Sequence, residues 1–88
     1  MEEFLSSIGI HNKGEKSSDG NYVIDFDDVN EYNKAFSKLD RAEELEETEE
    51  SSVTNSSMSS IIYTNDEYIL TLTADFDNDE YRLVVQKV

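Results

Sequence analysis

The last third of the chain alternates apolar and polar residues, and this alternation limits the possible fold more than any other feature of the sequence. Every second residue of a strand points to the same side of its sheet, so alternation predicts strands that bury one side. Three such strands are predicted over residues 60–64, 67–73 and 80–87. Asn65 and Asp66 suit a tight turn between the first two. We therefore expect a C-terminal block of antiparallel strands.

A strand followed by a helix is predicted nearer the N-terminus. Residues 22–26 alternate in the same way, and Asp27 or Asp28 is a good helix N-cap, because its carboxylate can accept hydrogen bonds from the first free amides of a helix. The helix that follows has one apolar stripe at helical spacing, made of Val29, Tyr32, Phe36 and Leu39. The stripe continues weakly through Ala42 and Leu45.

These elements predict a single α+β domain over residues 1–88. Its sheet is small and mostly antiparallel, with three C-terminal strands plus one N-terminal strand, and one main amphipathic helix packs on one face. Residues 1–20 are expected to form a short helix and a loop, and the serine-rich residues 51–59 are expected to form a flexible connection. A chain of 88 residues leaves room for one modest core and little room for a deep cavity as well.

The charge of the chain restricts its partners. It has 21 acidic and 7 basic residues, for a formal charge of -14. An excess of this sign argues against direct binding of nucleic acid or anionic membranes, and it favours basic protein surfaces or divalent metals. The absence of cysteine excludes disulfides and thiolate sites. No apolar run approaches membrane-spanning length, so a cytoplasmic protein is the simplest expectation.

Seven carboxylates lie within residues 40–50, with Arg41 as the only cation among them. They are Asp40, Glu43, Glu44, Glu46, Glu47, Glu49 and Glu50. In a helix, this acidic run would place one negative charge on about every 2 Å of the axis, close to the roughly 1.7 Å of duplex DNA. Runs of like charge are most often solvated tails. The alternative is a contact surface for a basic partner.

The position of the acidic run, directly after the amphipathic helix, favours the second alternative. Acidic side chains near a helix C-terminus oppose the helix dipole, and like charges four residues apart repel one another. If the helix continues into the run, its last turns should fray unless a cation covers them. The sequence offers little beyond Arg41, so a basic partner is expected to supply that cation.

A second acidic segment is expected in the loop over residues 74–79 and at the start of the next strand. It contributes Asp75, Asp77, Asp79 and Glu80. Its alternating oxygen ligands resemble a calcium loop, but Glu80 replaces the required glycine, and Gln86 replaces the glutamate that closes such a site. We therefore predict no metal and no cofactor. Asp27 and Asp28 can lie at the same end of the sheet and enlarge this acidic surface.

The sequence contains no recognisable catalytic set. His11 is the only histidine, it lies in a polar segment, and no nucleophile can be assigned to it. We predict no catalytic residue and no enzyme activity. The five tyrosines are assigned mainly to the core. The alternative is an exposed aromatic patch that anchors an interface beside the acidic surface.

In size, charge and α+β layout, the chain resembles small phage-encoded inhibitors, including anti-CRISPR proteins and acidic DNA mimics. The resemblance lies in the acidic run and in the acidic loop. It implies a non-enzymatic inhibitor that binds a basic nucleic-acid-binding protein in the host cytoplasm, for example a CRISPR effector or a restriction or repair enzyme, by imitating nucleic-acid phosphates. The alternative is an immunity protein or antitoxin that neutralises a basic toxin. The acidic residues of both segments are the predicted partner contacts.

Overall fold

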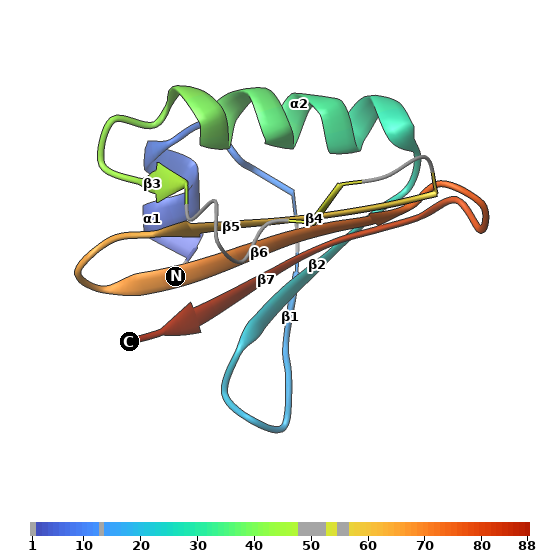
Figure 1. Ribbon diagram of the computed structural model, residues 1–88. Helices are drawn as coiled ribbons and strands as arrows, with labels where there is room; N and C mark the ends of the chain where they lie inside the picture. Colours follow the sequence, from blue (N-terminus) through green and yellow to red (C-terminus); the bar gives the residue numbers. More distant parts are fainter. Residues whose placement is uncertain (1, 13, 48–52, 55–56) are drawn as a thin grey trace.

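Four long antiparallel strands form the centre of one sheet, and the main helix lies across one side of it (Figure 1). The computed structural model describes residues 2–12, 14–47, 53–54 and 57–88. In sheet order, the four strands are β2 (Tyr22–Phe26), β7 (Glu80–Lys87), β6 (Tyr68–Asp75) and β5 (Met58–Thr64). The main helix is α2 (Val29–Arg41), and a short helix, α1 (Glu2–Ser7), lies near the N-terminus. The predicted α+β class is confirmed.

Three strands of two residues each extend the sheet, and the sequence did not predict them. β1 (Glu15–Lys16) pairs with β2, whereas β3 (Glu46–Glu47) and β4 (Val53–Thr54) both pair with the outer edge of β5. The predicted sheet of three C-terminal strands plus one N-terminal strand is therefore the central part of a larger one. Two residues are too few to show a period, so the neighbouring strand rather than the local pattern determines this pairing.

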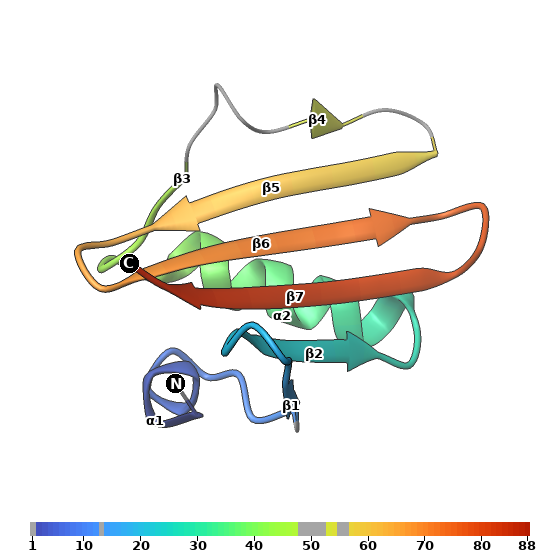
Figure 2. The ribbon, with the colours of Figure 1, turned by 90° about the horizontal axis from the view of Figure 1, so that it is seen from below.

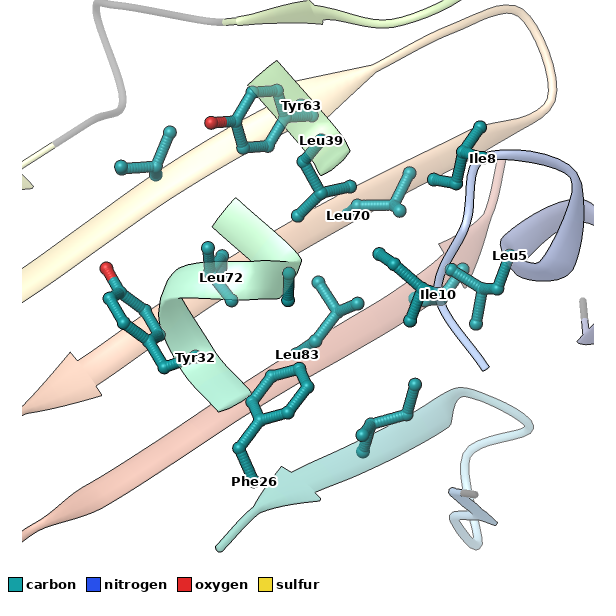
Figure 3. Close-up of a cluster of buried hydrophobic side chains, with 14 of the residues drawn as sticks. Leu5, Ile8, Ile10, Phe26, Tyr32, Leu39, Tyr63, Leu70, Leu72 and Leu83 are labelled. Carbon is teal, nitrogen blue, oxygen red and sulfur yellow. The ribbon is translucent and has the colours of Figure 1, made fainter. Parts of the chain in front are cut away.

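The core lies between α2 and one face of the sheet, and every second residue of the long strands contributes to it (Figure 3). The strand residues with 0% exposure are Ile24, Leu70, Leu72, Leu83 and Val85. The core also receives Tyr32, Ala35 and Leu39 from α2, and Leu5, Ile8 and Ile10 from the N-terminal segment. The strand residues between the buried ones point to the opposite face, as the alternation predicts.

Helix α2 begins at a predicted cap. The Asp28 carboxylate accepts a hydrogen bond from the backbone amide of Glu31 at 3.0 Å. This bond satisfies one free amide of the first turn and places a negative charge at the positive end of the helix dipole. Val29, which the apolar stripe assigned to the core, is the first helical residue and is 40% exposed, so the buried stripe begins at Tyr32.

Helix α2 ends at Arg41, so it includes only the first two residues of the acidic run, and a helical continuation beyond them is wrong for the residues that the structure describes. Ala42 has extended backbone angles, and its amide donates to the Leu39 carbonyl at 3.2 Å. Leu45 is buried and returns the chain to the core, and Glu46–Glu47 then pairs with β5. Burial of Leu45 and pairing with a strand edge both require the helix to stop. From Glu43 to Glu47, the acids of the run therefore lie outside the helix, whose C-terminal end disfavours negative charge.

Two predicted connections contain more strand than expected. Val53–Thr54 and the first residues of β5 belong to the sheet, although residues 51–59 were predicted as a flexible connection. The predicted loop over residues 74–79 is shorter, because Asp75 pairs with Glu80 and only residues 76–79 join the strands. In both places the polar composition suggested a loop, whereas an adjacent strand edge supplies backbone partners that composition does not reveal.

Candidate functional site

The two predicted acidic segments lie at opposite ends of α2 (Figure 1). The acidic run follows the C-terminal end of the helix, and the loop between β6 and β7 lies beside its N-terminal end. The 13 residues of α2 separate these ends by about 20 Å, at about 1.5 Å per residue. A single partner that contacts both segments must therefore span at least this distance.

The first acidic surface, which we call the run surface, consists of Glu43, Glu44, Glu46 and Asp66. With Thr64 and Asn65, these residues line an open hollow of about 340 Å³. The pairing of β3 with β5 assembles it, because the register places Glu46 opposite Thr64, beside the turn that carries Asp66. Asp66 was not among the predicted contacts. The sequence predicted that Asp66 lies in the turn after residues 60–64. It did not predict the pairing of β3 with β5, which brings the acidic run to that turn.

The remaining carboxylates of the acidic run are placed differently. Glu47 pairs with Tyr63, and neighbouring strand residues point to opposite sides, so Glu47 faces the helix side of the sheet while Glu46 faces away. Asp40 is exposed in the last turn of α2. Glu49 and Glu50 lie outside the described residues. The acidic run is therefore not one continuous surface within the described part of the chain.

The second acidic surface, which we call the loop surface, consists of Asp25, Asp75, Asp79 and Glu80. These residues line an open hollow of about 530 Å³ whose apolar lining includes Phe26, Met58 and Tyr81. Asp25 joins the surface because β2 pairs with β7, a contact that the sequence did not predict.

Other acidic residues lie around the loop surface. Asp27 and Asp28 follow the end of β2 directly, so they lie at this end of the sheet, where the sequence suggested they could lie. Burial raises the pKa of the Tyr81 hydroxyl, and the charges of Asp79 and Asp28 raise it further, which places both carboxylates near this ring. Asp77 is exposed in the β6–β7 loop. The acids at this end of the molecule therefore come from β2, from the start of α2 and from the β6–β7 loop.

The loop that carries these acids is held by its own side chains. Asp75 accepts hydrogen bonds from the backbone amide of Asn78 at 3.3 Å and from its side-chain amide at 2.7 Å. Asp79 has a φ of 53°, a left-handed conformation that aspartate tolerates better than most residues. The Asp75 carboxylate therefore stabilises the turn between β6 and β7. Within the described residues, no group of three or more His, Cys, Asp or Glu side chains is arranged to hold a metal ion.

Few cations balance the acids. Arg82 donates from Nε to Asp25 at 2.7 Å, and this contact raises the pKa of the guanidinium. Lys34 approaches Glu31 at 3.9 Å. These are the ion pairs that the described residues form, and neither includes a carboxylate of the run surface. The carboxylates of the run surface are therefore not neutralised by an ion pair within the described residues.

The tyrosines belong mainly to the core, as predicted. Four of them are buried: Tyr22, Tyr32, Tyr63 and Tyr81. The fifth, Tyr68, is partly buried and stacks on Phe4 with ring centroids 4.7 Å apart. The sequence missed a different aromatic residue, Phe76, which is 37% exposed in the β6–β7 loop beside the loop surface. No local pattern distinguishes it from a core residue.

Tyr63 provides a test of the packing beside the acidic run. It is 2% exposed, and its hydroxyl has no hydrogen-bond partner among the described residues. A buried hydroxyl without a partner costs roughly 1–3 kcal/mol, so we expect Tyr63→Phe to raise the free energy of unfolding by about 1 kcal/mol at neutral pH. Chemical unfolding measures this change. A phenylalanine variant less stable than the parent protein would show that the hydroxyl is bonded.

The same substitution should alter the response to alkaline pH. Burial raises the pKa of Tyr63 to about 12, and the charges of Glu47 and Asp40 add to the effect. The unfolded chain, with the ordinary pKa of 10.0, loses this proton first. The free energy of unfolding of the parent is therefore unaffected by this group below pH 10, and it falls as the pH rises through about 12, so the advantage of Tyr63→Phe grows over that range. The other tyrosines affect both proteins alike. The difference between the parent and Tyr63→Phe therefore isolates this loss.

Comparisons with known proteins leave the family of the chain open. No protein-family model matches it, and no curated protein and no solved structure matches it either. No helix in the described residues is long and apolar enough to cross a membrane. A function must therefore be inferred from the chemistry of the two acidic surfaces.

Proposed function

We propose that this protein is a non-enzymatic inhibitor that occupies the nucleic-acid site of a basic protein, such as a CRISPR effector or a restriction or repair enzyme. The run surface carries this proposal. Its four carboxylates are exposed and line one hollow. No cation among the described residues forms an ion pair with them. A cleft built to bind phosphates presents arginine and lysine side chains that would pair with such carboxylates.

The distribution of charge also supports inhibition by occupancy. Exposed carboxylates remain hydrated in the free protein, so they cost the fold little beyond mutual repulsion. On approach to a basic cleft, the same charges accelerate association and favour partners of opposite sign. The loop surface supplies a second acidic contact about 20 Å away, at the other end of α2. A partner that binds a nucleic-acid backbone along its length has basic residues over at least that span.

The proposal is tested by displacement with DNA. The protein is immobilised and incubated with a bacterial lysate at low ionic strength, and bound proteins are eluted with short duplex DNA. We expect DNA to release basic nucleic-acid-binding proteins, and we expect retention to fall at about 0.15 M salt, where the screening length is about 8 Å. Capture of neutral or acidic proteins alone, or of basic proteins that DNA does not release, would contradict the proposal.

A matched pair of variants then tests the run surface. Glu43→Gln with Glu44→Gln should weaken binding of the DNA-released partner about tenfold, because two of the proposed contacts lose their charge. Glu3→Gln with Asp19→Asn changes the net charge equally at exposed positions outside both acidic surfaces, and it should weaken binding by less than about twofold. Equal losses in the two variants would mean that total charge, and not this surface, determines binding.

A further inference from the structure

One face of the sheet is left uncovered by the described part of the chain. Figure 2 looks onto this open face, with α2 behind the sheet and no described helix in front of it. Thr71 lies at its centre, between its cross-strand partners Ile62 and Val84. Val23 and Ile69 extend the apolar patch, and all five residues are partly exposed. The patch is therefore a continuous group of partly exposed apolar side chains on three neighbouring strand pairs, and the centre of a protein interface has this apolar character.

Acidic residues surround this patch. The strand registers place five carboxylates on the open face, from Glu15, Asp25, Glu46, Asp75 and Glu80. Arg82 is the cation that the described strands place on this face, and Asp25 already pairs with it. On the opposite side of the molecule, α2 exposes Lys34, Lys38 and Arg41 and carries two acids, Glu31 and Asp40. The register of β3 adds one further acid, Glu47, to that side. The acids thus predominate on the open face and the cations on the helix.

One acidic pair on the open face is locally unfavourable. Asp75 and Glu80 occupy directly opposite positions on β6 and β7, where like charges destabilise a sheet. The hollow of the loop surface lies beside them, and Met58, at 54% exposure, forms part of its apolar lining. A long basic side chain could place its aliphatic stem against this lining and its charge between the two carboxylates.

We propose that the open face of the sheet docks on a basic protein whose contact patch has an apolar centre and a basic rim. This inference rests on the proposed function, and it assigns the orientation of the complex: the open face meets the partner, and the cationic side of α2 faces away. Charge decides between the possible occupants. A second copy of this chain would bring another acidic face against this one, and like charges across an interface disfavour the pairing.

A basic peptide tests the surface without knowledge of the partner. The isotope-labelled protein is titrated with acetyl-Arg-Leu-Arg-Leu-Arg-amide and followed by amide chemical shifts in nuclear magnetic resonance. We expect larger shifts at Thr71, Thr73 and Val84 than at Lys34 and Lys38. Acetyl-Arg-Ser-Arg-Ser-Arg-amide should bind several-fold more weakly, because it lacks the apolar centre, and the peptide with Glu in place of Arg should not bind.

Two variants with the same charge change locate the contact. Thr71→Arg places a cation at the centre of the open face and should raise the Kd of the leucine-containing peptide about tenfold. Asn33→Arg places the same side chain on the exposed side of α2 and should change the Kd by less than about twofold. The shift map of the parent protein is an independent measurement, so a Thr71→Arg variant that fails to fold does not remove the test.

Other results would overturn the inference. One such result is a set of amide chemical-shift changes that is confined to the run surface, or that is equally large on both sides of the molecule. Another is an equal change in the peptide Kd for Thr71→Arg and Asn33→Arg. Absence of peptide binding would also overturn it. A dimer that Thr71→Arg dissociates, seen by sedimentation, would assign the face to a second copy. None of these results affects the DNA displacement test, because that test measures the release of captured proteins by DNA and not the binding of a peptide to the open face. The two proposals can therefore fail separately.

Discussion

Leu83→Ala is expected to lower the free energy of unfolding by about 2–5 kcal/mol, whereas Val84→Ala, at the next position, should lower it by less than about 1 kcal/mol. Leu83 has no exposed surface and lies under α2 in the middle of the core (Figure 3). Its truncation removes buried contacts and leaves a cavity that the surrounding strands cannot close. Val84 lies on the open face, where truncation exposes no core and creates no cavity.

Urea unfolding followed by circular dichroism measures both changes. A domain of this size has a total stability of about 5–15 kcal/mol, so Leu83→Ala should shift the midpoint strongly or leave the protein partly unfolded. The pair also tests the one-sided core. If Val84→Ala costs as much as Leu83→Ala, the open face is packed against something in solution, and its role as a free docking surface is contradicted.

Gly14→Ala is expected to cost about 3 kcal/mol, the upper part of the usual range for overpacking. A Cβ at Gly14 would lie 2.5 Å from the backbone oxygen of Val23, 2.8 Å from Ile24 Cγ1 and 2.9 Å from Tyr22 Cε2. The nearest of these atoms belongs to the backbone of β2, so rotation of a side chain cannot relieve the contact. The Gly14 amide also donates to the Tyr22 hydroxyl at 2.9 Å, and a displaced chain would lose this bond.

Gly20→Ala is the matched control for this substitution. A Cβ at Gly20 would meet no atom within 4 Å, but its φ of +86° disfavours any side chain, so the expected cost is about 1 kcal/mol. Thermal unfolding of both variants separates steric exclusion from backbone strain. A larger loss for Gly20→Ala than for Gly14→Ala would show that the N-terminal segment does not pack on β2 as the structure has it.

The long elements could be predicted because their signals are local. The strand over residues 22–26 and the start of α2 at Val29 agree with the structure, since alternation, helical spacing and an N-cap aspartate each act within a few residues. The two-residue strands could not be predicted in this way. Their hydrogen bonds depend on a partner far along the chain, as when Glu46–Glu47 pairs with β5.

The candidate site was predictable only in part. The sequence identified the acidic run and the acidic loop, because charge is a property of each residue alone. It did not place Asp66 or Asp25 in the acidic surfaces, because strand pairing brings them there. It also allowed the helix to continue into the acidic run. Acids near a helix C-terminus oppose the helix dipole, which favours an early end to the helix. The burial of Leu45 in the core also requires the chain to leave the helix, and this tertiary contact cannot be read from the local sequence.

The amino-acid order alone therefore specifies an acidic α+β chain with four long strands and one main helix, because each of these properties depends on neighbouring residues. The packed structure adds the arrangement of the charges. A single long helix can cover one face of the sheet, and the strand registers then determine that Glu46 and Asp75 face away from it. Packing, rather than composition, separates the cations of α2 from the acids of the open face, because composition alone does not determine on which side of the sheet a residue lies.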